Sequence, residues 1–219
     1  MPGMSTRYDQ FCALARAAEI LGERWTLLIV RELMLGPRRF SDLKERLDGI
    51  SASVLSQRLS RMEEDGLIER AYLEPPAASN VLQLTEKGRA LEPAVYELIR
   101  WGGRFLMPAR PGERREPDWT RLVFQAYARK GRVPRRSFEV HVIENGAEAV
   151  FGVTGTAQGT RIEATQPDAE VRFSAGFETL LGLMSGRLDS AAAIQEGLIE
   201  AEGDIAALQA FPAMFDSGR

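Results

Sequence analysis

The chain has 219 residues, 44% of them hydrophobic and 27% charged, which is enough for one large domain or for two small domains that each bury a core. It has no apolar run near the roughly 20 residues that a membrane span needs, and its first residues lack the order of a secretory signal, so we expect no membrane association. One cysteine and one histidine exclude a disulfide framework, favour a cytoplasmic location and predict neither a metal site nor a cofactor.

The net charge of −3 hides a strong asymmetry along the chain. Residues 1–110 hold 16 basic against 15 acidic side chains, residues 111–136 hold 8 against 3, and residues 137–219 hold 4 against 13. We therefore predict a first domain over 1–110, a basic linker with the start of a second domain over 111–136, and an acidic second domain over 137–219.

The first half has the apolar spacing of helices. An i, i+3, i+4, i+7 stripe runs through 9–22, and the segment 25–36 is apolar nearly all round, as in a buried central helix. Ser41 is placed to cap a short third helix over 41–47, and a fourth helix follows over 51–65 after a Gly-containing turn. Two short helices across such a turn predict a helix-turn-helix.

The outer face of the fourth predicted helix carries small hydroxyls, one amide and arginine where Glu and Lys would be better helix formers. Short side chains let a helix enter the major groove, where Ser, Gln and Arg can hydrogen-bond base edges. An ordinary amphipathic helix with a Ser-rich surface is the alternative, and for Arg58 a salt bridge on the helix surface is a second one. The predicted DNA-contacting residues of this helix are Ser51, Ser53, Ser56, Gln57, Arg58, Ser60 and Arg61.

A β-hairpin follows, with predicted strands over 67–74 and 81–85, and then a long helix from 85 to about 106. A hairpin directly after a helix-turn-helix is typical of the wing of a winged helix. We predict that the wing and the residues just before the third helix contact the DNA backbone through Arg38, Arg39, Ser79 and Asn80.

The same stretch resembles the HxlR-type winged-helix transcriptional regulators of bacteria. The resemblance covers about residues 8–106 and is carried by "ERWTLLIVRELMLGPRRFSDLKERLDGIS", "LSQRLSRMEEDGLIER" and "LTEKGRALEPAVYELIRWG". It implies homodimers bound to double-stranded operator DNA, and a two-fold protein requires an inverted-repeat operator. Some relatives sense oxidants through a cysteine at the position of Cys12, although free cysteine is also commonly a small buried hydrophobe.

Two helices offer apolar faces for the dimer. The last helix of the first half has a seam spaced 4, 3, 4, 3, which suits packing against another helix, and the first helix has its own stripe. The alternative is that both faces pack on their own domain. The predicted dimerisation residues are Phe11, Leu14, Leu91, Val95, Leu98, Gly102 and Phe105.

The second half changes from helical periodicity to alternation. A hairpin over 137–155 turns at Asn145-Gly146, strands follow over 160–165 and 169–174, and two helices, a short strand over 198–203 and a terminal helix over 204–215 complete the pattern. We predict an α+β fold, with the winged helix-turn-helix followed by an antiparallel sheet covered by helices on one face.

This half resembles the sterol-carrier-protein fold through "QPDAEVRFS" and "LLGLMSGRLDSAAAIQEGLIEAEGDIAALQAF". The resemblance implies a tunnel for lipids or other apolar molecules between sheet and helices. The acidic balance favours a neutral or cationic ligand over a fatty-acid anion. The candidate pocket residues are Ile162, Val171, Phe173, Phe177, Leu181, Met184, Phe211 and Phe215.

Enzymatic chemistry finds little support in the sequence. The Gly-rich segment 152–161 joins two strands and does not open a helix, as a phosphate loop would. His141 alternates within a strand, and Glu200, Glu202 and Asp204 fit a solvated face. Three hypotheses follow: a ligand-responsive DNA-binding repressor, which leads; a DNA-binding regulator whose second domain serves only protein contacts; and a lipid-binding protein with a vestigial winged helix.

Overall fold

The computed structural model describes residues 7–216, which form two compact units. The first unit ends at Val95 and the second begins at Tyr96. No helix in this described part of the chain is long and apolar enough to cross a membrane.

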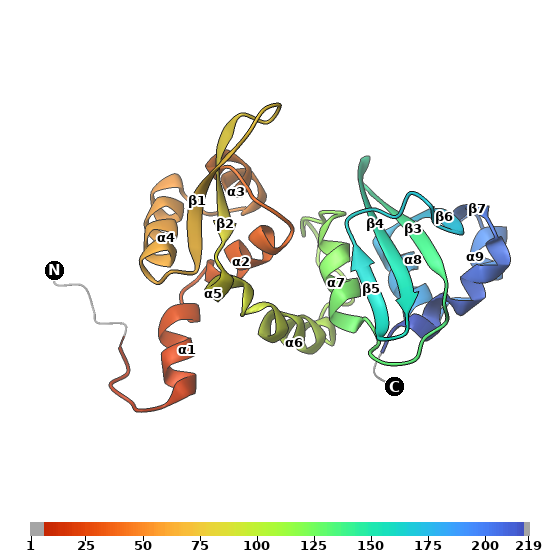
Figure 1. The fold of residues 1–219 in the computed structure, drawn as a ribbon, viewed down its shortest axis with the longest axis horizontal. Coiled ribbons are helices and arrows are strands. Elements are labelled where there is room, and N and C mark those ends of the chain that lie inside the picture. The colour runs from red at the N-terminus through yellow and green to blue at the C-terminus, as the bar shows by residue number, and fades with distance from the viewer. Residues whose placement is uncertain (1–6, 217–219) are drawn as a thin grey trace. The chain divides into compact units, whose positions relative to one another are not determined.

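The first unit is a helix-turn-helix with a β-hairpin. Its elements are α1 (Ala13–Leu21), α2 (Thr26–Met34), α3 (Phe40–Arg46), α4 (Ala52–Glu64), β1 (Ile68–Leu73), β2 (Ser79–Leu84), α5 (Glu86–Arg89) and the start of α6 (Glu92–Gly103). Figure 1 shows the β1–β2 hairpin extending beyond the helices of this unit, as a wing does. Buried side chains of α2, α3 and α4, such as Ile29, Leu43 and Leu55, form its core.

Several boundaries in this unit differ from the prediction. The first helix begins at Ala13 and not near residue 9, so Phe11 precedes it. The third helix begins at Phe40 and not after Ser41, because the Asp42 carboxylate accepts a hydrogen bond from the Arg39 N–H (3.1 Å) and so satisfies the helix start one residue earlier. The predicted helix from 85 to 106 is interrupted into α5 and α6. At α5, Gly88 packs so closely on the residue before β1 that an added Cβ would lie 2.1 Å from the Leu67 carbonyl oxygen.

A buried acidic residue, Glu32, ties two helices of the unit together. Its side chain has no exposed surface, and it accepts hydrogen bonds from Arg31 on α2 (2.7 Å) and from Arg46 on α3 (2.5 Å). Two guanidinium partners offset the desolvation of this carboxylate, so the ion-paired cluster fixes α3 on the central helix. The apolar pattern of 25–36 gave no sign of it.

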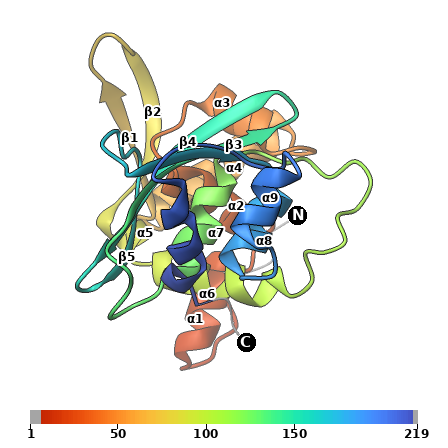
Figure 2. The ribbon, with the colours of Figure 1, turned by 90° about the vertical axis from the view of Figure 1, so that its right-hand side faces the viewer.

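The second unit is an α+β fold with a five-stranded sheet in the order β5-β4-β3-β6-β7. Its elements are the rest of α6, α7 (Trp119–Tyr127), β3 (Ser137–Glu144), β4 (Ala147–Thr156), β5 (Gly159–Glu163), β6 (Val171–Ala175), α8 (Phe177–Met184), α9 (Ser190–Gln195), β7 (Glu200–Gly203) and a 3₁₀ helix, η1 (Ile205–Met214). Figure 2 shows α7, α8 and α9 on one face of the sheet.

The sheet is mixed, and the prediction of a purely antiparallel sheet was wrong. β6 pairs with β3 in parallel, while the other three pairings are antiparallel. The chain reaches β6 because segment 164–170 crosses over β4 at Gly152, where an added Cβ would lie 2.6 Å from the Gln166 Cβ and 2.9 Å from the Thr165 carbonyl oxygen. A glycine there makes the short crossover possible.

Aromatic side chains dominate the core of the second unit. Phe124 of α7 contacts Phe151, Phe211 and Phe215 with ring centroids 5.1–5.9 Å apart, so the segment between the predicted domains supplies part of this core. The predicted terminal helix over 204–215 is present as a 3₁₀ helix with Pro212 inside it.

Candidate functional site

The α4 helix presents the polar face that the sequence predicts. Ser51 caps it by accepting a hydrogen bond from the Val54 N–H (3.2 Å), and the Ser51 and Ser53 hydroxyls lie 3.0 Å apart. Leu55 and two further apolar side chains of α4 anchor the opposite face in the core. The predicted DNA-contacting residues Ser53, Ser56, Gln57, Ser60 and Arg61 are all exposed.

Three of these side chains are available for a ligand. Ser56, Gln57 and Ser60 have no side-chain hydrogen bond to any residue within 7–216. Arg61 pairs with Glu64 (3.1 Å) and Asp65 (3.4 Å) on its own helix, in a geometry that remains half exposed. Exposed ion pairs of this kind contribute little stability, so the Arg61 head can leave them at small cost.

Arg58, unlike the other predicted DNA-contacting residues of α4, is mostly buried and ion-paired. Its Nη2 atom donates to Glu23 Oε2 at 2.7 Å, and its side chain is 16% exposed. The salt-bridge alternative therefore describes its observed contact, and Arg58 connects α4 to the residues just before α2. Together with Gln57, Ser60 and Arg61, this pair borders a polar groove of about 590 Å³ beside the helix.

The arginines before α3 are attached to the wing. The backbone of Arg38 exchanges two hydrogen bonds with Leu82 of β2 (3.0 and 2.8 Å). This isolated antiparallel bridge attaches the segment before α3 to the hairpin. The exposed side chain of Arg39 donates from Nη2 to the carbonyl oxygen of Ala77 in the wing turn (3.1 Å). The two residues predicted to contact phosphates thus also position the wing.

The two predicted wing residues differ in exposure. Asn80 is exposed, but the Ser79 hydroxyl is buried and has no hydrogen-bond partner within the described chain, so in this conformation it cannot reach a phosphate. Tyr72, which the sequence analysis did not single out, is paired with Asn80 across the hairpin and is 56% exposed. Its place in an alternating strand opposite Asn80 was the available signal.

The α1 helix and the residues just before it carry uncovered apolar side chains. Phe11 is fully exposed and Leu14 is 77% exposed, while Ala15 is buried. Cys12 lies between Phe11 and Leu14 in the sequence, at the N-cap of α1, and it is a free, exposed cysteine. Cys12 is therefore not a small buried hydrophobe within a single copy of the chain. Its redox role stays a prediction.

The predicted seam of α6 divides into buried and exposed parts. Val95 is 7% exposed and packs within the first unit, so it does not belong to a free surface there. Leu98 and Phe105 are exposed. Trp101 was not among the predicted seam residues, but it is 62% exposed and its ring centroid lies 5.2 Å from that of Phe105. The spacing 98, 101, 105 is i, i+3, i+7, and this was the signal for Trp101. The remaining seam residues, Leu91 and Gly102, are half-buried.

The candidate pocket residues of the second unit mostly form its core. Five of them are buried in the core cluster: Val171, Phe173, Met184, Phe211 and Phe215. The other three, Ile162, Phe177 and Leu181, are half-buried. Ring contacts such as Phe173–Phe211 (5.3 Å) fill the space between sheet and helices where the sequence predicted a tunnel.

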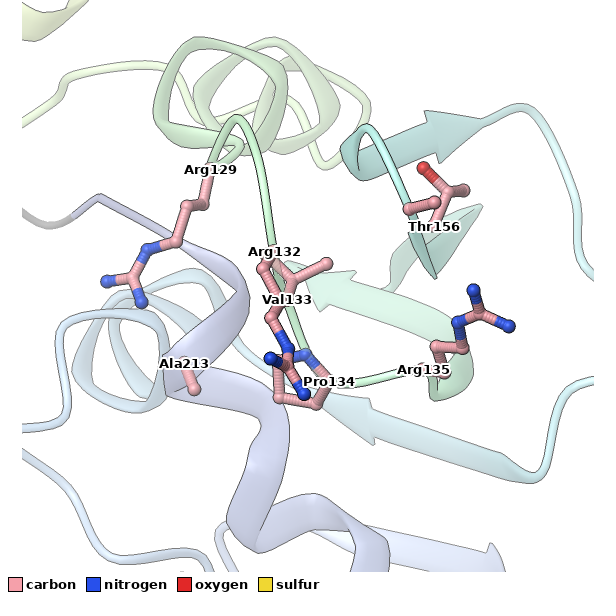
Figure 3. A pocket seen from close by; sticks show the side chains of 8 residues that line it. Arg129, Arg132, Val133, Pro134, Arg135, Thr156 and Ala213 are labelled. Atoms are coloured by element: carbon pink, nitrogen blue, oxygen red, sulfur yellow. The ribbon is translucent and has the colours of Figure 1, made fainter.

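Near the sheet edge lies a different pocket of about 840 Å³. It is lined by the loop after α7, the β4–β5 turn and η1, and Figure 3 shows its arginines. The signal for this pocket in the sequence was the basic run "RKGRVPRR", which the sequence analysis interpreted only as part of a basic linker.

Candidates for enzymatic or metal chemistry lie on the outer face of the sheet. His141 contacts Glu148 (2.6 Å) and Glu139 (3.2 Å), and Glu139 also accepts a hydrogen bond from Arg172, which lowers the pKa of its carboxyl. Within residues 7–216, no three histidine, cysteine or acidic side chains group in a way that could hold a metal ion.

A helix-turn-helix whose second helix exposes a polar face beside a β-hairpin defines a winged-helix DNA-binding protein. Residues 20–110 match the model of the HxlR-like helix-turn-helix family, and residues 127–216 match that of the SCP-2 sterol transfer family.

Curated relatives are named as regulators. The HTH-type transcriptional regulator YodB of Bacillus subtilis is 37% identical over 42% of this chain and 82% of its own length. An uncharacterized HTH-type transcriptional regulator of Mycobacterium tuberculosis is 43% identical over 43% of this chain, which spans 59% of that relative's length. A solved structure of reduced YodB is 34% identical, with 46% of this chain and 100% of that chain covered and a TM-score of 0.39.

The chain therefore belongs to the HxlR-like helix-turn-helix family, with an SCP-2 domain following the winged helix.

Proposed function

We propose that this protein is a homodimeric, cytoplasmic transcriptional repressor that binds an inverted-repeat operator through α4 and the wing, and whose SCP-2 domain responds to a small molecule. The observation that carries the proposal is the face of α4. Ser56, Gln57 and Ser60 are exposed, make no side-chain hydrogen bonds to other described residues, and lie on a helix fixed by a buried apolar stripe. No catalytic role is proposed, because the relatives are named as transcriptional regulators.

Operator selection followed by mutation tests the recognition helix. Fragments retained by the full-length protein should share an inverted repeat with half-sites about 34 Å apart, one helical turn. Gln57→Ala should change the preference at one base pair per half-site by about 1–3 kcal/mol, because a bidentate amide–adenine contact is lost. Gln158→Ala, an exposed glutamine in the second unit, is the matched control and should leave the preference unchanged. An unchanged base preference in Gln57→Ala would remove Gln57 from the readout.

Dimerisation is proposed through the exposed apolar side chains on α1 and α6 and in the residues directly beside them. Phe105→Asp should shift the protein towards monomer in sedimentation velocity, because a charge is placed in an apolar interface, and it should weaken operator binding along with it. Leu198→Asp, at an exposed leucine of the second unit, should leave the sedimentation coefficient unchanged. A Phe105→Asp protein that remains dimeric, with Phe11→Asp also dimeric, would place the interface elsewhere.

A further inference from the structure

The basic run between α7 and β3 forms a pocket that neither the DNA-binding face nor the apolar core uses. Its lining consists of Arg129, Arg132, Val133, Pro134 and Arg135 from this loop, Thr156 and Ala157 from the β4–β5 turn, and Ala213 from η1. In Figure 3 the arginines are spaced along the loop around Val133 and Pro134, with Ala213 on one side and Thr156 on the other. A volume of about 840 Å³ is within the usual range of small-molecule sites.

The loop is held in place by its backbone. The Arg129 N–H donates to the Met214 carbonyl oxygen (3.0 Å), the Thr160 N–H donates to the Arg129 carbonyl oxygen (2.8 Å), and the Gly155 N–H donates to the Arg136 carbonyl oxygen (2.8 Å). Both ends of the loop are therefore fixed to neighbouring segments.

Two glycines of the neighbouring hairpin allow this close approach. A Cβ at Gly155 would lie 1.8 Å from the Pro134 carbonyl oxygen, and one at Gly159 would lie 2.4 Å from the Arg129 carbonyl oxygen. Gly159 also has a φ of 133°, which favours glycine. The pocket wall is thus fixed by backbone contacts, and only its arginine side chains need to move when a ligand enters.

The arginines of the loop differ in their partners. Arg129 is paired with Asp216 (2.8 Å), and Arg136, just outside the pocket, is paired with Glu170 (3.1 Å) and Asp204 (3.6 Å). Arg132 and Arg135 are exposed and have no acidic side chain or other hydrogen-bond partner among the described residues. Two uncompensated guanidinium groups therefore stand at one pocket, in a domain that is otherwise acidic, with 4 basic against 13 acidic side chains over 137–219.

This local charge favours an anion and opposes the expectation of a neutral or cationic ligand drawn from the overall acidic balance. Guanidinium groups bind carboxylate and phosphate through charge-assisted, bidentate hydrogen bonds. The lining between them is apolar at Val133, Pro134, Ala157 and Ala213. An extended polyanion such as DNA needs a row of cationic groups, whereas Arg129 and Arg136 are already ion-paired, which leaves two guanidinium groups for a small anion.

We propose that this pocket binds a small amphipathic anion, with its carboxylate or phosphate held by Arg132 and Arg135 and its apolar part on Val133, Pro134 and Ala213. The inference goes beyond the proposed regulatory function, since it requires neither dimerisation nor an operator. Its test is direct binding, so its failure and that of the DNA-binding proposal can be told apart.

The experiment titrates the full-length protein with octanoate, 1-octanol, inorganic phosphate and a random-sequence DNA duplex in an isothermal calorimeter at low salt. Octanoate should bind at least about tenfold more tightly than octanol or phosphate, because only octanoate engages both the arginines and the apolar lining. Added salt should weaken its binding. Arg132→Gln/Arg135→Gln should reduce the octanoate affinity about tenfold or more. Arg187→Gln, at an exposed arginine outside the pocket, is the matched control and should bind as the wild type does.

Equal octanoate affinity in the double variant and the wild type, or no octanoate binding at all, would overturn the proposal. Octanol binding as tightly as octanoate would overturn the role of the charge, and phosphate binding as tightly as octanoate would overturn that of the apolar lining. Binding of the duplex alone, lost in the double variant, would overturn the small-molecule assignment and give this loop to nucleic acid. A circular dichroism melt of each variant checks that its fold is retained.

Discussion

The Arg39 side chain contacts the wing turn in the structure, and we expect it to contact a phosphate when DNA is bound. Its Nη2 atom already donates to the Ala77 carbonyl oxygen, which is a partner that a phosphate can replace. Arg39→Ala should weaken binding to all sequences alike and reduce the slope of log K against log salt by about 1, because one phosphate contact is lost. Anisotropy titrations between about 50 and 200 mM salt measure both quantities.

Arg187→Ala, at an exposed arginine of the second unit, controls for the loss of one positive charge. An Arg39→Ala protein with the wild-type salt slope would mean that Arg39 only supports the wing. A loss confined to some sequences would point to a displaced wing and not to a phosphate contact.

For single residues, the sequence predicts which side chains share an exposed face better than it predicts which residues contact each other. The exposed hydroxyls and amide of α4 follow from helical periodicity alone, because side chains at fixed spacing share a face. The pair between Arg58 and Glu23 joins residues 35 positions apart, and no local pattern contains that information. The buried position of Glu32 is hidden for the same reason, since its partner Arg46 is on another helix.

Among the elements, the outer face of the sheet contains an acid-sensitive contact between β3 and β6. Glu139 is 7% exposed, and the hydrogen bond from Arg172 lowers the pKa of its carboxyl from the usual 4.5, with a smaller contribution from His141. A depressed pKa in the folded state means that the unfolded chain binds the proton more readily. This contribution to stability is complete above pH 4.5 and is lost as the pH falls below it through the lowered pKa.

Urea unfolding of the wild type and Glu139→Gln between pH 7 and pH 3 tests this contact. The wild type should be more stable at pH 7, and the difference in the free energy of unfolding should shrink as the pH falls below about 4.5. Glu196→Gln, at an exposed carboxylate directly after α9, should follow the wild type throughout. A difference between the wild type and Glu139→Gln that does not change with pH would show that packing alone, and not charge, stabilises this contact.

Element by element, the helices and strands follow from periodicity and turn chemistry, and Asn145-Gly146 marks its hairpin in the structure as in the sequence. The parallel pairing of β6 with β3 does not follow, because alternation gives a strand but not its neighbour. The break between α5 and α6 does not follow either, because the Thr85 cap fixes where a helix starts and not how far it runs.

For the whole molecule, the proposal requires that the SCP-2 domain affects DNA binding. An effector can do this only if it binds the DNA-competent and DNA-incompetent states with different affinity, and such coupling typically amounts to about 1–3 kcal/mol. The operator affinity of the full-length protein should therefore change by about 5- to 150-fold with the effector, and operator DNA should change effector affinity by the same factor.

Operator titrations with and without fractions of a cell lipid extract, together with melting curves, measure this coupling. A fraction that raises the melting temperature and shifts operator affinity contains the effector. If neither quantity responds to any fraction, the second domain has no regulatory role and the protein-contact alternative is favoured.

The crossing of segment 164–170 over Gly152 also constrains the time order of folding. β3, β4 and β5 are consecutive hairpin partners and can pair as soon as they are made. β6 lies beside β3 only after the chain has passed over β4, so its pairing closes a longer loop and must follow the meander. Until then the β3 edge is an unpaired template open to strands of other copies, which makes the interval before β6 docks the period when a nascent chain is most exposed to aggregation.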